Sequence, residues 1–306
     1  MKLTRRRFLA CIATAALNGA ACSSSQVTQH RFYALGAEAQ ITLYGKPRQA
    51  EAALLACRKE ITAVESAFSL YDPNSMLSQL NRDGVVSMDT RFSTLLGHAL
   101  HMAEITSGAF DPTIQPLWQA LSKGDDHAGT NVEQALQLIG WRDLVVKQGR
   151  AQFLKPGMAV SFNGIAQGYA ADRVTAILAE RGFKNILVNL GEFSARGTKQ
   201  GAPWFLGIRD PINGRIAAEV KPDNSAIATS EPRGTLIAGR PHIFDPLQRA
   251  GERWASVTVE ASEALHADSL STAIAASPIA DAAKLLAAGN ATRAWLIDTS
   301  GRLETI

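Results

Sequence analysis

Apolar residues recur along the chain with two different periods, which predicts a mixture of helices and strands. Between Arg48 and Phe68 they return every three or four residues and form one stripe, the pattern of an amphipathic helix. Phe32 to Gly45 instead alternates with a period of two, which predicts an opening strand. Further helices are predicted after the N-cap Ser75 as far as Asn81, and over Phe92–Thr106, Val132–Ile139, Tyr169–Arg181 and Asp268–Ala287.

The second half of the chain alternates short apolar runs with helical segments. A polar loop is predicted over Lys123–Asn131, but no Pro/Ser-rich linker divides the sequence. We therefore expect one interlocked α+β unit with a cleft. Its later strands are predicted over Met158–Phe162, Asn185–Leu190, Trp204–Asp210, Ala226–Ser230, Ala255–Ala261 and Ala294–Thr299.

Composition indicates a folded protein, because 46% of the 306 residues are hydrophobic and 19% are charged. The formal net charge is +3, but Lys2 and Arg5–Arg7 carry +4, and subtracting them leaves −1 for the rest. A nearly neutral body gives no electrostatic reason to expect nucleic-acid binding.

The basic cluster opens a segment with the features of an export signal. Thr4–Ala10 reads TRRRFLA, and an apolar stretch through Leu17 and small residues to Ala21 follow it. The paired arginines resemble a twin-arginine signal. The apolar run is well under the roughly 20 residues that a membrane-spanning helix needs. We expect residues 1–21 to be a removable export signal, residues 22–306 to be the folded domain, and the protein to be periplasmic.

Cys22 leaves two fates open for the mature N-terminus. The sequence GAAC resembles a lipoprotein cleavage site, which would anchor the protein by lipid through Cys22. Because Gly19 stands where leucine is usual, plain cleavage after Ala21 is equally compatible. The remaining cysteines are Cys11, within the signal, and Cys57, so neither a disulfide framework nor a cysteine metal site is expected.

Asn163–Gly168 joins an apolar run to a predicted helix through the sequence NGIAQG. The first N–H groups of a helix lack internal partners and can face an anion. Glycine lets a ligand approach the backbone closely. The stretch lacks both G-x-G-x-x-G and a Walker loop, and Asn-Gly turns before helices are common. It is either a plain turn or a ligand cradle.

Three further stretches carry candidate chemistry. Asp268 and Thr272 are four apart, so on a helix they share a face and can bind Mg²⁺; alternatively, they make a cap and a backbone hydrogen bond. His242, in RPHIFDP, can accept a proton from a hydroxyl or pack in a turn. Asp111, in SGAFDPT, is a turn former or a polar contact to a ligand.

Taken together and in this order, the motifs resemble the ApbE family of FAD:protein FMN transferases. Each motif is weak alone, but their joint order is specific. The resemblance covers roughly Phe32 to Ala276. The matching stretches are Ser69–Ser75, Gly108–Thr113, Gly164–Asp172, Asn189–Gly191, Trp204–Pro211, Ala228–Ser230, His242–Pro246 and Ala267–Ala273.

The resemblance implies an enzyme that moves FMN from FAD to a Thr or Ser hydroxyl of an exported or membrane redox protein and releases AMP. It also implies mixed or antiparallel sheets with flanking helices and a nucleotide cleft. Mg²⁺ would be held by Asp268, Thr272 and the Ala166 carbonyl, with Asp268 and His242 as the catalytic residues. FAD would be contacted by Tyr71, Asp111, Gly164, Ala166, Gln167, Gly168 and Asp172.

The chain departs from the family pattern at positions near the proposed phosphates. Gln167 replaces the usual lysine, which removes a positive charge but keeps hydrogen-bond donors. Glu192 replaces the second glycine of N-x-G-G, and the Asn163–Gln167 variant resembles a NosX-type subgroup. Two alternative functions remain: a Mg²⁺-dependent FAD pyrophosphatase, in which water replaces the hydroxyl, and a flavin-binding protein without chemistry.

Overall fold

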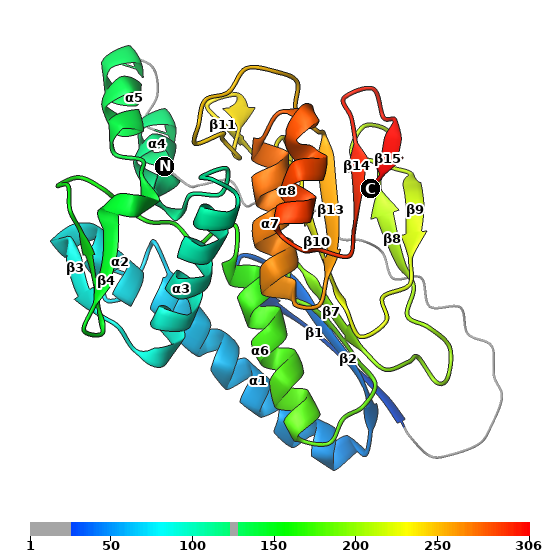
Figure 1. The fold of residues 1–306 in the computed structure, drawn as a ribbon. Helices are drawn as coiled ribbons and strands as arrows, with labels where there is room; N and C mark the ends of the chain where they lie inside the picture. The colour runs from blue at the N-terminus through cyan, green and yellow to red at the C-terminus, as the bar shows by residue number, and fades with distance from the viewer. Residues whose placement is uncertain (1–25, 123–127) are drawn as a thin grey trace.

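An eight-stranded sheet forms the centre of the molecule, shown in Figure 1 as a computed structural model that describes residues 26–122 and 128–306. Every neighbouring pair of strands in it is antiparallel. The predicted export signal and Cys22 lie outside the described residues. In spatial order the strands are β1 (Gln26–Ala34), β2 (Ala37–Gly45), β6 (Ile186–Asn189), β7 (Phe193–Arg196), β10 (Ala226–Ser230), β13 (Ser256–Ala261), β14 (Arg293–Ile297) and β15 (Leu303–Thr305).

Three helices cover one face of this sheet: α1 (Pro47–Phe68), α6 (Ala166–Glu180) and α7 (Ala264–Ala276) (Figure 1). The stripe predicted on α1 is buried in the main core, where Cys57 and Val64 are fully enclosed. Helix α6 packs between α1 and α7. Burying these apolar faces against the sheet is the main stabilising contribution to this layer.

The opposite face of the sheet has its own smaller core. A hairpin of β8 (Leu206–Arg209) and β9 (Ile216–Val220) supplies Leu206 and Ile208 to it, and the main sheet supplies Phe193 and Trp295. The hairpin's register shifts between Ile208 and Arg209.

The remaining elements fall into two groups. On one side of the molecule (Figure 1) lie α2 (Met76–Asp83), α3 (Thr90–Ile105), α4 (Gln115–Ser122), α5 (Ala128–Gln137), the sheet of β3 (Val85–Ser87), β5 (Arg150–Phe153) and β4 (Leu144–Lys147), and 3₁₀ turns at Pro112–Ile114 and Trp141–Asp143. Helix α8 (Ala282–Ala288), which follows a 3₁₀ turn at Ile279–Asp281, packs against α7, and β11 (Leu236–Ile237) and β12 (Arg240–Pro241) form a separate hairpin.

The α+β class predicted from the sequence is confirmed, with local differences. The opening strand is two strands, because Leu35 and Gly36 take positive φ values of 51° and 77° and turn the chain back. Helix α5 begins at Ala128 rather than Val132, and the predicted loop before it lies partly outside the described residues.

Met158–Phe162 is buried but is not a strand. Its backbone pairs instead with a side chain: Asn81 accepts from the Val160 N–H (2.7 Å) and donates to the Val160 carbonyl (2.9 Å). An asparagine amide offers the same donor and acceptor as a peptide group, so it satisfies this segment without a neighbouring strand. The Ser161 N–H donates to the Pro112 carbonyl (2.9 Å), which fixes the segment just before α6.

Within residues 26–122 and 128–306, none of the helices combines the length and the apolar character needed to cross a membrane.

His98 makes the junction of α3 and α7 sensitive to acid. Its Nε2 lies 3.0 Å from Ser269 Oγ, and burial, followed by the nearby His266 and His101, lowers the pKa of His98 to about 4. A histidine with a depressed folded pKa adds stability above about pH 6.5, the unfolded value, and that stability is lost as the pH falls toward 4.

We therefore expect His98→Gln to flatten the loss of stability between pH 6.5 and 4 by about 1–3 kcal/mol. Urea unfolding at a series of pH values measures this free energy of unfolding. If it fell equally with pH in the variant and in the unmodified protein, His98 would not be the cause of the acid sensitivity.

Candidate active site

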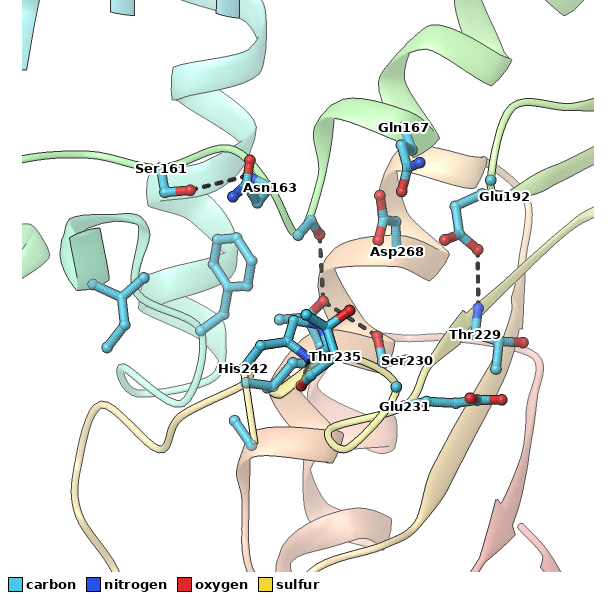
Figure 2. A pocket seen from close by; sticks show the side chains of 18 of the residues that line it. Ser161, Asn163, Gln167, Glu192, Thr229, Ser230, Glu231, Thr235, His242 and Asp268 are labelled. Atoms are coloured by element: carbon cyan, nitrogen blue, oxygen red, sulfur yellow. Dashed lines mark hydrogen bonds between the residues drawn. The ribbon is translucent and has the colours of Figure 1, made fainter. Parts of the chain in front are cut away.

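A single cavity brings together residues from β10, the start of α6, the middle of α7 and the loop that follows β12. Figure 2 shows Asp268, Gln167 and Glu192 turned toward one another, with His242 and Thr235 on a loop across the cavity. Six of the ten site residues predicted from the sequence line it: Asp111, Gly164, Gln167, His242, Asp268 and Thr272.

Asp268 and Thr272 face the start of α6 from α7. The Gly168 N–H donates to Asp268 Oδ2 (3.0 Å), so the first turn of α6 meets the carboxylate. Thr272 Oγ1 lies 3.5 Å from the Gly164 carbonyl and 3.3 Å from Ser230 Oγ. The predicted shared face of Asp268 and Thr272 is therefore present, and α7 begins at Ala264, so Asp268 is not a helix cap.

Gly168 permits this close approach of α6 to α7. A Cβ built there would lie 2.7 Å from the Ala264 carbonyl carbon and 2.8 Å from Asp268 Cβ, and it would also clash with the Ala264 oxygen. Because two of these atoms belong to backbone, they cannot swing aside as the end of a side chain can.

We expect Gly168→Ala to force the helices apart and to lower the free energy of unfolding by roughly 1–3 kcal/mol, the usual cost of overpacking at a rigid contact. Chemical denaturation measures it. Gly97→Ala is the matched control, because a Cβ on that helical glycine meets nothing within 4 Å. Equal stability of the two variants would show that the helices can separate at no cost.

Asp268 has a second buried carboxylate as its neighbour, Glu192. Both are at most 5% exposed. Burial raises the pKa of Asp268 to about 7, although its bond from Gly168 opposes the rise. Burial, and after it the charge of Asp268, raises the pKa of Glu192 well above its ordinary value. The tight turn Asn189–Glu192, with Gly191 at φ 104°, aims Glu192 inward, where it accepts from the Thr229 N–H (2.9 Å).

These donors fit a divalent cation that prefers oxygen. Among the described residues neither Asp268 nor Glu192 forms an ion pair, so their buried charge lacks a cationic partner. The same part of the chain contains no group of three or more His, Cys, Asp and Glu side chains that could hold a metal. A site of one or two carboxylates, a hydroxyl and a carbonyl, completed by substrate phosphates, is typical of Mg²⁺.

Asp172 lies behind this site rather than in it. Its two carboxylate oxygens accept from the N–H groups of Ala264 (2.9 Å) and Leu265 (2.8 Å), the first residues of α7. It therefore caps the helix that carries Asp268 and Thr272. Burial raises the pKa of Asp172 to about 6 despite these bonds.

His242 is held by the carbonyls of its own loop. Its Nδ1–H donates toward Pro232 O (3.0 Å) and Thr235 O (3.1 Å), which selects the tautomer with the lone pair on Nε2. The loop is in turn anchored through Asp245, which accepts from Arg249 Nε (2.9 Å) and Arg253 Nη2 (3.1 Å). The histidine is thus positioned to accept a proton at a defined atom.

The other predicted contacts lie in different settings. Asp111 lines the cavity, but its carboxylate already accepts from Thr113 and from the Trp141 N–H (3.1 Å), so it also fixes a turn. Tyr71 is 75% exposed and is not among the described residues that line the cavity. Ala166 and Gly168 form the first turn of α6. Contact of these residues with FAD stays a prediction.

Ser230, Glu231 and Arg209 also line the cavity, although they were not predicted as site residues. Ser230 ends β10 and bonds Thr272, Glu231 follows it, and Arg209 ends β8. A charged residue at the end of a strand is typical of a solvent-facing position. The only signal in the sequence was that Ser230 and Arg209 lie within the matching stretches Ala228–Ser230 and Trp204–Pro211.

Comparison with known proteins agrees with the fold and the motifs. The ApbE family model matches residues 35–296. The FAD:protein FMN transferase of Vibrio cholerae is 28% identical over 233 residues, 69% of each chain, and that of Salmonella typhimurium is 27% identical over 241 residues, 70% of this chain and 68% of that one.

Solved structures share the same architecture. The flavin transferase ApbE from Vibrio cholerae superposes with a TM-score of 0.82 at 22% identity, covering 92% of this chain and 97% of that one. The ApbE protein from Thermotoga maritima superposes with a TM-score of 0.81 at 26% identity, covering 91% and 96%. Because the family model spans most of the sequence, this chain belongs to the ApbE family.

Proposed function

We propose that this protein is an FAD:protein FMN transferase, in which a Thr or Ser hydroxyl of an exported or membrane redox protein attacks FAD in the presence of Mg²⁺. The activity follows from family membership and from the names of the relatives. The metal and the hydroxyl acceptor are supported by the chemistry of the cavity.

The proposed reaction accounts for every bond and for the proton. The acceptor oxygen forms a bond to the FMN phosphorus, the bond from that phosphorus to the AMP oxygen breaks, and the hydroxyl proton goes to His242 Nε2. Asp268, Thr272 and a carbonyl at the start of α6 would hold Mg²⁺. Bound there, the ion supplies positive charge that stabilises the diphosphate and the departing AMP.

One observation carries the proposal: the cavity joins two buried carboxylates, which form no ion pair with any residue that the structure describes, to an oriented histidine. Asp268 and Glu192 provide a place for a cation, and the carbonyls of Pro232 and Thr235 hold His242 in its proton-accepting tautomer. A protein that only bound flavin would gain nothing from the two carboxylates, because buried carboxylates without a cation cost stability.

The decisive experiment incubates the protein with FAD, Mg²⁺ and a candidate acceptor that carries a Thr or Ser site. We expect an in-gel flavin signal and an FMN mass increment on the acceptor, with AMP released in equal amount. Release of FMN and AMP without a labelled acceptor would identify a pyrophosphatase instead. FAD binding without any turnover, across acceptors that a second family member labels, would identify a flavin carrier.

We also propose that the enzyme works in the periplasm, exported by the twin-arginine-like segment of residues 1–21. Subcellular fractionation of the full chain, with Arg5 and Arg6 both changed to Lys as the matched variant, tests this. Retention of the variant in the cytoplasm and export of the unmodified chain are expected.

A further inference from the structure

Arg209 is unusual among the residues of the cavity. Of the described residues that line it, Arg209 is the only lysine or arginine, and five others are acidic: Glu38, Asp111, Glu192, Glu231 and Asp268. Most of the charged side chains around the cavity are therefore acidic. An anionic substrate would find one guanidinium there, that of Arg209.

The guanidinium of Arg209 has donors to offer. Its Nε and Nη2 atoms are buried, yet neither has a hydrogen-bond partner within the described part of the chain. Buried donors without partners are costly, and charged ones more so, which makes them candidates for contact with a ligand. An arginine fork matches the oxygens of a phosphate in geometry as well as charge.

Arg209 is the last residue of β8, where the regular pairing of the hairpin ends. Ile208 pairs with Ala218 and Arg209 with Ile216, so Ala217 on β9 is the extra residue of a bulge opposite Arg209. Asp210 stabilises the turn that follows. Its carboxylate accepts from the Ile212 N–H (2.7 Å), and its N–H donates to the Arg215 carbonyl (2.8 Å).

Arg209 lines the same cavity as Asp268 and Thr272, the proposed metal ligands. Burial raises the pKa of Glu231, and the charge of Arg209 opposes that rise, so the two side chains interact. Glu231 directly follows Ser230, whose hydroxyl lies 3.3 Å from Thr272 Oγ1. Arg209 and Thr272 line the same cavity, so a dinucleotide that fills the cavity can contact both side chains.

We propose that Arg209 binds a phosphate group of the flavin dinucleotide through its unpartnered Nε and Nη2 donors. This role rests on the proposed function for the identity of the ligand. Arg209 then supplies positive charge that the Gln167 side chain, on the same cavity wall, does not.

FAD titrations followed by flavin fluorescence, without acceptor and in EDTA and in Mg²⁺, test the proposal. We expect Arg209→Gln to weaken FAD binding about 10- to 100-fold, the usual worth of a charge-assisted hydrogen bond. Arg209→Lys should lose less FAD affinity than Arg209→Gln, because lysine keeps the positive charge. Arg215→Gln is the matched control, since Arg215 is exposed beyond the end of the same strand and should bind FAD normally.

Two further variants separate a ligand contact from a structural pairing with Glu231. If Arg209 served only to balance Glu231, Glu231→Gln would weaken FAD binding as Arg209→Gln does; we expect unchanged or tighter binding instead. Adding Gln167→Lys to Arg209→Gln should restore part of the affinity. Thermal stability of Arg209→Gln should stay equal or rise, because no hydrogen bond is lost.

Competition by AMP, FMN, riboflavin and adenosine shows which phosphate is bound. If Arg209→Gln loses affinity for AMP alone, Arg209 binds the phosphate of the leaving half of FAD. If it loses affinity for FMN alone, Arg209 binds the phosphate of the transferred half. The affinities for riboflavin and adenosine should not change. Unchanged FAD, AMP and FMN affinities in Arg209→Gln, or an equal loss in Glu231→Gln, would overturn the inference. Because no acceptor is present, a failure of FMN transfer would not be mistaken for either result.

Discussion

Asp268→Asn is expected to abolish FMN transfer, with a loss on the order of 100- to 1000-fold, because it removes the formal charge with which α7 would hold the cation. The amide keeps the size of the side chain and can still accept from Gly168. Transfer is measured by mass spectrometry of the acceptor. Asp223→Asn, at an exposed loop, is the charge-matched control. Undiminished transfer by Asp268→Asn would remove Asp268 from the mechanism.

The same variant carries a signature that does not depend on activity. A carboxyl whose pKa is raised in the folded protein, here from 3.8 to about 7, destabilises the fold increasingly as the pH rises between those values. Without metal, Asp268→Asn should therefore be more stable than the unmodified protein at pH 8, by roughly 2–4 kcal/mol. Adding Mg²⁺ should stabilise only the unmodified protein. A stability gain that is equal at pH 4 and pH 8 would contradict this.

His242→Gln is expected to lower transfer roughly 100- to 10,000-fold, the range that general base catalysis contributes. Glutamine can donate to the carbonyls of Pro232 and Thr235, so the loop should keep its shape. FAD affinity should stay within about threefold, because the loss of the base affects the chemical step rather than binding. His101→Gln, on the exposed face of α3, is the matched control. Equal rates for the two variants would exclude His242 as the base.

The hydrophobic pattern predicted the fold where an element buries one continuous face. Helix α1 was found because its stripe at Cys57, Ile61 and Val64 packs into the main core. The pattern failed at Leu35 and Gly36, since the alternation continues across the turn and only the backbone conformation divides it. It also misassigned Met158–Phe162, which is as apolar as a strand but is paired by the side chain of Asn81.

The candidate site was also predicted only in part. Asp268 and Thr272 lie in one stretch and His242 in another, and the resemblance to the ApbE family implied that they share a site; all three line the cavity. Asp172 belongs to the same motif as Gly164, yet it points to the start of α7, which no spacing rule reveals. Arg209 was missed because it ends a short strand of the hairpin, and nothing in its sequence context shows that this end of β8 lies at the cavity.

A crystal grown with FAD and Mn²⁺, the latter as an anomalous substitute for Mg²⁺, tests the central claim most directly. We predict one anomalous peak within bonding distance of an Asp268 carboxylate oxygen and Thr272 Oγ1, with diphosphate oxygens in the same coordination shell. A peak elsewhere, with the diphosphate remote from both side chains, would contradict the account.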